Sequence, residues 1–419
     1  MLPQSVSRKA AMFINLTVIS VLLSSLKGLV FSEPVPLTPD RVALHPRATT
    51  CTPTAGGSST VDDVPAIQSA IRSCASGTIL IPAGQTYHIN SQLSFAGCTG
   101  CTLQLDGVLS VSTDFNYWNG KSQVISLSKI TGATVTGSGT INGNGQASWD
   151  HITTATDYVR PKLIRVEGCN NIHFSGFTVK DAPMFHIVTN GNSKDITYSD
   201  LTLHSVSTSA NVAHNTDGFD IGPASNVRVL NSQVTNDDDC VVLKPGADQV
   251  HVEGVTCTGS HGLSVGSLAS TAGANDVVTN SIFKNCTVAS SDKAAGIKFF
   301  DSSSGHGSAS VSNVTWQDII CDKCDYAFRV LTCYQSTTTA DCTAHPAVAN
   351  MQGIVLDGFT GTTSGHYKNN VANINCSPSG TCGITVNRFS VTAPSGANTV
   401  LCANTPSNLG LTCTSGASG

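Results

Sequence analysis

Three carboxylates, an imidazole and an ammonium recur at related spacings in the middle of the chain. Asp217 lies in HNTDGFDIG, Asp239 lies 22 residues later in NDDDC, and His261 lies another 22 residues later in GSHGLSVGS. Asp238 precedes Asp239, and Lys298 follows His261 by 37 residues. Cleavage of a glycosidic bond needs one carboxylic acid to protonate the leaving oxygen and one carboxylate to activate water or attack. Carboxylates placed close together cannot all ionise easily, so at least one pKa rises and that group becomes the acid.

Each of these segments also has a structural interpretation. Asp217 in NTDG suits an Asx turn, and the aspartates of NDDDC could form a solvated loop or part of a calcium site. The acidic residues do not have the spacing of an EF-hand loop, so we expect no metal ion. The spacing shared by Asp217, Asp239 and His261 favours an active site.

The elements that must position these residues are short strands. An alternating pattern of apolar and polar residues begins near residues 171, 195, 226 and 249, with further copies near 276, 313 and 383. Alternation with a period of two indicates strands with one buried face. Recurrence every 20–30 residues without helices between the strands predicts an all-β solenoid, a single right-handed parallel β-helix. A β-propeller is the alternative. In a β-helix, residues one coil apart become neighbours at about the 4.8 Å strand spacing.

A solenoid needs covered ends. Residues 62–74, DDVPAIQSAIRSC, place Val64, Ile67 and Ile71 on one helical face and predict a short N-terminal capping helix. Cys51 could bond Cys74 and hold this helix. A Cys402–Cys413 bond could close the last coil.

The N-terminus and composition indicate a secreted protein that binds no nucleic acid. Residues 1–32 join Arg8 and Lys9 to an apolar stretch, which is typical of a signal peptide and too short for a membrane span. Residues 33–48 are interpreted as a pro-segment or linker, and residues 49–419 as the catalytic domain. The net charge of −5 and the absence of a basic run argue against phosphate binding.

All sixteen cysteines follow residue 50. An even number in a secreted chain predicts disulfides. Pairs close in sequence are Cys98/Cys101, Cys321/Cys324, Cys333/Cys342, Cys376/Cys382 and Cys402/Cys413. We also expect Cys240 to bond Cys257. Sequons at Asn285, Asn313 and Asn375 predict glycosylation.

The segments NTD, NDDDC with LKPG, GSHGLSVGS and GIK resemble, in combination, the signature blocks of the family 28 glycoside hydrolases, the polygalacturonases. The resemblance runs from about Cys51 to the end. It implies an inverting hydrolase of pectic α-1,4-galacturonosyl bonds without a cofactor. It further implies that Asp238 is the general acid, that Asp217 and Asp239 activate water, and that His261 supports the acid. Lys298 and, from a looser block, Tyr334 would bind substrate.

Two departures from the family pattern bear on the substrate. Asp237 stands where the family has glutamine, and Gly296 stands where it has an arginine that grips unsubstituted galacturonate. Gly296 is therefore interpreted as a substrate-binding position that leaves room beside the sugar. AAGIK, CTPTAGG and the C-terminal segment resemble the fungal branch that cuts xylose-substituted galacturonan internally. Exo-polygalacturonase, rhamnogalacturonan hydrolase and a non-catalytic carbohydrate-binding β-helix are the alternatives. A monomer is expected.

Overall fold

The computed structural model describes residues 49–303, 305–336 and 338–419. These residues belong to one compact unit that begins at Ala48. The expected signal peptide and pro-segment lie outside the described residues. Within the described part of the chain, no helix is long and apolar enough to cross a membrane.

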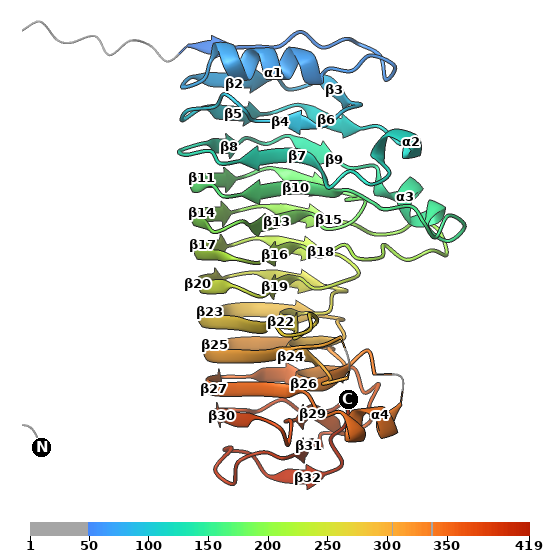
Figure 1. The fold of residues 1–419 in the computed structure, drawn as a ribbon, viewed down its shortest axis with the longest axis vertical. Helices are drawn as coiled ribbons and strands as arrows, with labels where there is room; N and C mark the ends of the chain where they lie inside the picture. Colours follow the sequence, from blue (N-terminus) through green and yellow to red (C-terminus); the bar gives the residue numbers. More distant parts are fainter. Residues whose placement is uncertain (1–48, 304, 337) are drawn as a thin grey trace, which may run out of the picture. The chain divides into compact units, whose positions relative to one another are not determined.

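The prediction of a right-handed parallel β-helix is confirmed. Every strand ladder within the described residues is parallel, and the coils stack one on the next from β1 and β2 to β32 (Figure 1). Two sheets form the walls: a 20-stranded sheet that contains two columns of strands, and a 12-stranded sheet.

Successive coils place equivalent strands in columns along the stack. The first column of the larger sheet contains β1 (Thr50–Cys51), β2 (Thr78–Ile81), β5 (Thr102–Leu105), β8 (Thr134–Thr136), β11 (Asn170–Ser175), β14 (Ser193–Ser199), β17 (Ala224–Leu230), β20 (Ala247–Glu253), β23 (Asn275–Ala289), β25 (Ser308–Asp322), β27 (Val348–Asp357) and β30 (Thr381–Asn387). The second column contains β3 (Thr86–Ile89), β6 (Val108–Val111), β9 (Thr140–Asn142), β12 (Thr178–Lys180), β15 (Thr202–His204), β18 (Gln233–Thr235), β21 (Thr256–Thr258) and β28 (Thr360–Thr362), and the long strands β23 and β25 run through both columns.

The smaller sheet contains β4 (Leu93–Ser94), β7 (Gln123–Ser128), β10 (Lys162–Glu167), β13 (Ile187–Asn190), β16 (Phe219–Ile221), β19 (Val241–Leu243), β22 (Leu263–Leu268), β24 (Lys293–Phe300), β26 (Tyr326–Tyr334), β29 (Asn370–Asn375), β31 (Thr399–Ala403) and β32 (Cys413–Ser415).

Residues in the left-handed conformation mark two corners of the coil. One corner column contains Asn171, Asp195, Asn226, Gln249, Asn280, Asn313 and Gly353, all at φ between 50° and 63°. Asparagine and aspartate tolerate this conformation better than other side chains. Their amides also bond from coil to coil, since Asn226 Nδ2 donates to Asp195 Oδ1 at 2.6 Å. The alternating segment that was expected to begin near residue 276 begins four residues later, because Asn280 is the corner residue of this coil.

The interior is filled by aliphatic and aromatic side chains. Phe174, Tyr198 and Phe219 contact one another in sequence, with ring centroids 5.1 and 5.3 Å apart. Further along, Trp316 stacks on Phe283 at 5.3 Å. The core therefore runs along the whole stack, and each coil contributes to it.

The predicted N-terminal cap is helix α1 (Val64–Ser73), which buries Val64, Ile67, Ala70 and Ile71. Asp62 Oδ1 accepts from Val64 N at 3.2 Å. Asp63 instead ties neighbouring segments, because its carboxylate accepts from Gly56 N and His88 N. The alternating pattern did not indicate three short helices in loops: α2 (Phe115–Trp118), α3 (Gly145–His151) and α4 (Thr339–Ala344).

The disulfide predictions are mostly confirmed. The bonds present are Cys51–Cys74, Cys98–Cys101, Cys240–Cys257, Cys333–Cys342, Cys376–Cys382 and Cys402–Cys413. The expected Cys321–Cys324 pairing is wrong: both are free and buried, as are Cys169 and Cys286. These four thiols act as small core side chains.

The corner residues generate a stability prediction. Replacing Asn226 by leucine should lower the free energy of unfolding by roughly 1–2 kcal/mol, because a bulky side chain is strained at positive φ. Asn226→Gly is the matched control and should retain most of the stability, since glycine adopts this conformation freely. Thermal unfolding of both variants checks this. A leucine variant as stable as the glycine variant would contradict the corner assignment.

Candidate active site

The sequence-predicted site residues converge on the loops that lead into the smaller sheet. Phe219, Val241 and Leu263 pair across β16, β19 and β22. Asp217, Asp239 and His261 each precede the paired residue by two positions. The spacing of 22 residues therefore corresponds to one coil.

Lys298 does not continue this column. Leu263 pairs with Ala295, so the residue two positions earlier is Lys293. Lys298 pairs with Gly266, five residues further along β24, and its side chain reaches back to Asp239. Lys293 was missed because this coil is longer than the two before it.

The buried side chain of Asn236 stabilises the NDDDC turn by hydrogen bonds. Its Nδ2 donates to Thr216 O in the preceding coil at 2.7 Å and to the carbonyls of Asp238 and Asp239 at 3.0 Å each. Asn236 is buried. The Cys240–Cys257 bond, with a Cα–Cα distance of 5.8 Å, fixes the same turn to the next coil.

Asp239 is a buried, ionised carboxylate. Its side chain is 1% exposed, and Lys298 Nζ donates to Oδ2 at 2.7 Å. Ser264 Oγ donates to Oδ1 at 2.7 Å, and Lys293 Nζ lies 3.9 Å from the same oxygen. Burial alone would raise the pKa of Asp239, but Lys298, Lys293 and Lys244 hold it well below its usual range.

Asp217 has the opposite environment. Its side chain is 3% exposed, and its Oδ1 has no hydrogen-bond partner among the described residues. Burial, with the charge of Asp238, raises the pKa of Asp217 well above its usual value, against the effect of Lys244. Lys244 Nζ lies 3.8 Å from both Asp217 and Asp220, and burial also raises the pKa of Asp220. Asp220 and Lys244 were not foreseen as site residues.

Asp238 is the most accessible of the three carboxylates, with 16% of its side chain exposed. His261 Nδ1 lies 3.2 Å from Oδ1, and Asn215 Nδ2 donates to Oδ2 at 3.3 Å. Burial would raise the pKa of Asp238, but the hydrogen bond from His261 leaves it lowered. Asp238 in turn raises the pKa of His261. Arg160 is buried and holds Asn215 through a 2.8 Å bond to its Oδ1.

The location of the proton differs from the simplest expectation. The resemblance named Asp238 as the acid, whereas the raised pKa belongs to Asp217 in the protein without substrate. Asp217 is buried with one carboxylate oxygen unpartnered, while Asp238 is paired with His261. Burial therefore separates the pKa values of two carboxylates that lie in neighbouring coils.

The interpretation of Gly296 as open space beside the sugar is wrong. Gly296 is buried, and a Cβ built there would lie 2.5 Å from Arg329 O and 2.8 Å from Lys293 Cδ. Tyr334 lies at the end of β26, with Lys298 Nζ 5.5 Å from its ring centroid. Both residues thus lie in the site, but Gly296 faces Lys293 and not a cavity.

Asp238, Asp239 and His261 could in principle hold a metal ion. One ligand atom from each lies within 4.8 Å of the others. The carboxylate of Asp239, however, already binds Lys298 and lies near Lys293. This local positive charge disfavours a divalent cation.

Hollows border the acidic turn on both sides and share Asp237 and Gly259. One of about 330 Å³ is lined by loop 205–213, and one of about 520 Å³ is lined by His261, Ser291 and Lys323. Asp237 is half-buried, and burial raises its pKa. The hollows follow the stacking direction, so an extended polymer can lie along them past Asp237 and His261 while contacting several coils.

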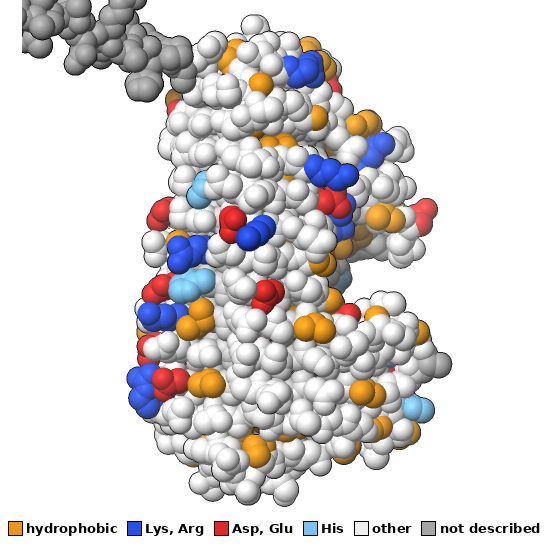
Figure 2. All heavy atoms as spheres, turned by 60° about the vertical axis from the view of Figure 1, so that its left-hand side comes forward, with side chains coloured by type: hydrophobic (Ala, Val, Ile, Leu, Met, Phe, Trp, Pro, Cys, Tyr) orange, Lys and Arg blue, Asp and Glu red, His pale blue; other side chains and the backbone are white. Residues whose placement is uncertain are grey.

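Two sets of loops project from the stack, and the surface is hollowed between projecting parts (Figure 2). On one side, Ser209 and Asn211 donate to Asp150 at 2.6 and 2.8 Å, which joins loop 205–213 to α3. On the other side, the loop that carries α4 directly follows Tyr334.

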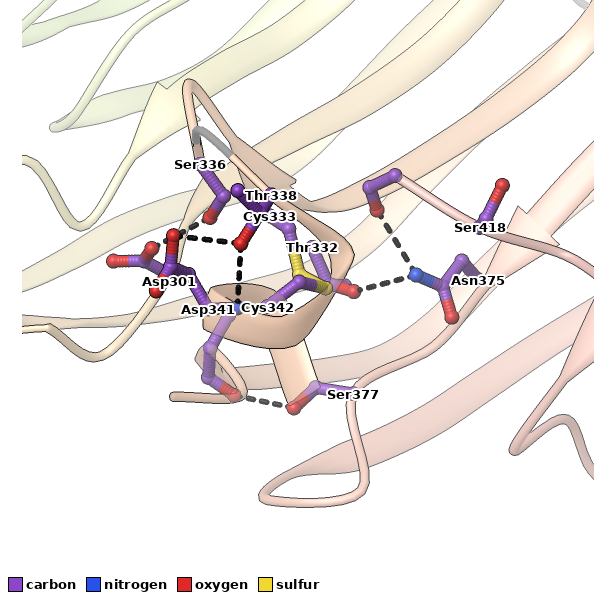
Figure 3. The surroundings of a disulfide bond; sticks show 12 residues. Asp301, Thr332, Cys333, Ser336, Thr338, Asp341, Cys342, Asn375, Ser377 and Ser418 are labelled. Atoms are coloured by element: carbon purple, nitrogen blue, oxygen red, sulfur yellow. Dashed lines mark hydrogen bonds between the residues drawn. A yellow bond between two sulfur atoms is a disulfide. The ribbon is translucent and has the colours of Figure 1, made fainter. Parts of the chain in front are cut away.

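The α4 loop is tied down at several points (Figure 3). The Cys333–Cys342 bond closes it, and Ser336 Oγ donates to Asp301 at 2.6 Å. Ser377 Oγ donates to Ala347 O at its far end. This loop is thereby held in place next to Tyr334.

The predicted glycosylation sites differ in access. Asn285 and Asn313 are exposed at coil corners. Asn375 is buried, and its Nδ2 donates to Thr332 Oγ1 at 3.2 Å and to Gly419 O at 2.9 Å (Figure 3). A glycan on Asn375 would break both bonds, so the structure argues against this third site.

The fold and the site together define a polysaccharide-cleaving enzyme: clustered carboxylates lie in neighbouring coils of a β-helix, next to hollows that run along the stack. The family model of Glycosyl hydrolases family 28 matches residues 72–413. The chain belongs to this family, and it is a glycoside hydrolase.

Similar proteins agree with this assignment. A probable endo-xylogalacturonan hydrolase A of Aspergillus flavus is 49% identical over 406 residues, which are 96% of this chain and 99% of that protein. The crystal structure of endo-xylogalacturonan hydrolase from Aspergillus tubingensis matches with a TM-score of 0.86 and 45% identity, covering 88% of this chain and 100% of that one. A polygalacturonase from Erwinia carotovora shares the fold, with a TM-score of 0.70 and 19% identity, covering 86% of this chain and 96% of that one.

The contrast between Asp217 and Asp239 gives a prediction about stability. The raised pKa of Asp217 means that this group costs stability once pH rises above its unfolded-state pKa, and that the cost grows until pH reaches the folded-state pKa. Asp217→Asn should therefore stabilise the fold at pH 7 by roughly 1–2 kcal/mol, with the gain shrinking as pH falls.

Asp239→Asn is the matched variant of opposite sign. The lowered pKa of Asp239 contributes stability that is present above the unfolded pKa and is lost as pH falls through the folded one. This variant should be destabilised at pH 7, and the loss should shrink in acid. Thermal unfolding of both variants from pH 3 to 7 checks the pair. The same sign of effect in both variants would contradict the charge assignment.

Proposed function

We propose that the chain is a secreted endo-hydrolase that cuts α-1,4-galacturonosyl bonds in xylose-substituted galacturonan with inversion at the anomeric carbon. The observation that carries the proposal is the column of Asp217, Asp239 and His261 with Asp238 beside it, next to hollows that follow the stack and include His261. The names of the relatives from Aspergillus support the substrate.

Accessibility supports Asp238 as the acid. Its side chain is 16% exposed, against 3% for Asp217 and 1% for Asp239, so it is the one of the three that can reach the oxygen of a bound glycosidic bond. For a general acid, geometry is the first requirement and the pKa the second. Bound sugar removes water from Asp238, and desolvation raises the pKa of a carboxylate. The raised pKa of Asp217 makes it the carboxyl that is protonated most easily before substrate binds, and desolvation by the sugar favours protonation of Asp238 as well.

Asp239 and Asp217 then act on water. Asp239 stays ionised beside Lys298, and Asp217 is ready to accept a proton once it has lost its own. His261, hydrogen-bonded to Asp238, sets the orientation of the acid. In this enzyme the carboxylates are crowded, since atoms of Asp238 and Asp239 lie within 4.8 Å, whereas inverting glycosidases usually separate theirs by about 6.5–9.5 Å. The anomeric form of the first product, followed by proton NMR, tests the inversion.

Lys298 has a double role in this proposal. It donates one hydrogen bond to Asp239, and its ammonium lies over the ring of Tyr334, the residue that the α4 loop follows. An ammonium has three donors, so the others are available to a sugar carboxylate. The site would then bind an acidic sugar at Lys298 and the branched polymer along the serine-rich hollows.

The acid assignment gives a prediction about rate. Asp238→Asn should lower kcat by about 10²–10⁴-fold, the usual contribution of a positioned acid, while the fold and the affinity for polymer are retained. Reducing-end release measures kcat, and circular dichroism checks the fold. Asp237→Asn, which changes the neighbouring carboxylate, is the control and should lose far less activity. A wild-type kcat in Asp238→Asn would contradict the assignment of Asp238 as the general acid.

The substrate is tested by parallel incubation of the purified protein with xylogalacturonan and de-esterified homogalacturonan. We expect faster hydrolysis of xylogalacturonan and products that are oligomers. Release of monomers from chain ends would favour exo-polygalacturonase, and cleavage of rhamnogalacturonan would favour rhamnogalacturonan hydrolase. Binding of polymer without any new reducing ends would leave a carbohydrate-binding β-helix.

A further inference from the structure

Lys293 is a buried ammonium at the centre of the site. Only 2% of its side chain is exposed. Its Nζ donates to His261 O at 2.6 Å and lies 3.3 Å from Asp292 Oδ2 and 3.9 Å from Asp239 Oδ1. It therefore joins the backbone of one functional residue to the carboxylate of another.

The strand register places Lys293 there. It precedes Ala295 by two positions, as His261 precedes Leu263, and these two strand residues are paired. Lys293 is thus the fourth member of the column formed by Asp217, Asp239 and His261. Its ammonium is buried and bonded to the His261 carbonyl, so it does not need to contact substrate.

Gly296 provides the space for this side chain. A Cβ at position 296 would lie 2.8 Å from Lys293 Cδ and 3.0 Å from Lys293 Cε. Such contacts are shorter than any ordinary carbon–carbon contact, so a larger residue would force the lysine stem to move. The glycine and the lysine therefore form one packing unit within β24.

Fold stability alone does not explain a lysine at this position. Burying an ammonium is costly, and a buried ion pair often contributes no more stability than apolar residues of the same size. Asp239 already has a closer partner in Lys298, at 2.7 Å. What Lys293 adds is a fixed bond to the carbonyl of His261, whose ring bonds the accessible carboxylate Asp238.

We propose that Lys293 is a positioning residue of the hydrolase. It holds the His261 turn next to Asp239, and Gly296 leaves the space that its side chain occupies. The proposal rests on the proposed function, because it assigns Lys293 to the alignment of His261 and Asp238 and to the charge of Asp239. It replaces the interpretation of Gly296 as room for a sugar: the glycine makes room for a second cation behind the catalytic carboxylates.

Charged groups from every neighbouring coil face this lysine or its partners. Asp238, Asp239 and Lys244 belong to the coils before His261, and Lys298 lies on the same strand as Lys293. Asp292 adjoins Lys293, and Arg329 on the next strand lies 3.8 Å from Asp292. Without the Lys293 charge, Lys298 and Lys244 alone lower the pKa of Asp239, so Asp239 is protonated more easily.

The test compares Lys293→Met, Lys293→Gln and wild type on xylogalacturonan. Both variants should lower kcat by at least about tenfold, part of the ~10²–10⁴ supplied by the acid–base pair. KM should stay within about twofold, because the lysine does not contact substrate. The pH–rate profile should move upward by about one unit, since loss of a nearby positive charge raises carboxylate and imidazole pKa values. Lys194→Met, an exposed lysine on β14, is the control for loss of one charge and should match wild type.

Glutamine can still donate a hydrogen bond to His261 O but carries no charge. A shift of the pH–rate profile in both variants would therefore come from loss of the charge and not from loss of that hydrogen bond or of packing. A second readout needs no substrate. The acid unfolding midpoint of both variants should move to higher pH, because Asp239 then loses its ionised form earlier as pH falls. Wild-type kcat, KM and pH profile in both variants would overturn the proposal. An inactive wild type would refute the proposed function, while the unfolding midpoint would still report on Lys293.

Discussion

The site depends on holding three carboxylates within a few ångströms of one another in a buried place. Asp217, Asp238 and Asp239 repel one another, and burial penalises the charge of each. Three lysines offset this cost, because Lys244 lies beside Asp217 and Lys293 and Lys298 lie beside Asp239. The offset is uneven: it lowers the pKa of Asp239 and leaves the pKa of Asp217 raised. An unequal distribution of charge among equal side chains is what acid–base cleavage requires.

The β-helix makes this arrangement possible because parallel register brings one position of each coil into a column. Asp217, Asp239, His261 and Lys293 come from four successive coils, yet each lies two residues before a paired strand residue. Corner residues such as Asn226 and Asn280 keep the coils in register. Loops of different length, such as 205–213 and the one carrying α4, can then be inserted beside the groove without moving the column.

The sequence predicts the fold and most of the site for a clear reason. The coils between Asp217 and His261 have the same length, so residues 22 positions apart in the sequence occupy equivalent positions in successive coils. Three members of the column could therefore be found by counting residues. Lys293 could not be found in this way because its coil is longer, although aligning strand starts, with GLSV paired to AAGI, would have indicated it. Gly296 was misinterpreted because the side chain that fills its space comes from three residues earlier on the same strand.

Other differences arise from three-dimensional burial, which spacing does not reveal. Cys321 and Cys324 have the spacing of a pair but lie in the core as free thiols. Asn375 has the sequon but is buried beneath the end of the chain. The proton on Asp217 depends on an unpartnered oxygen and on distances to lysines from other strands.

Neutron diffraction of the substrate-free protein at mildly acidic pH tests the charge distribution most directly, because it locates deuterium on each side chain. The account predicts a deuteron on Asp217, none on Asp239, and fully charged ammonium groups on Lys293 and Lys298. A deuteron on Asp239, or a neutral Lys293, would contradict it.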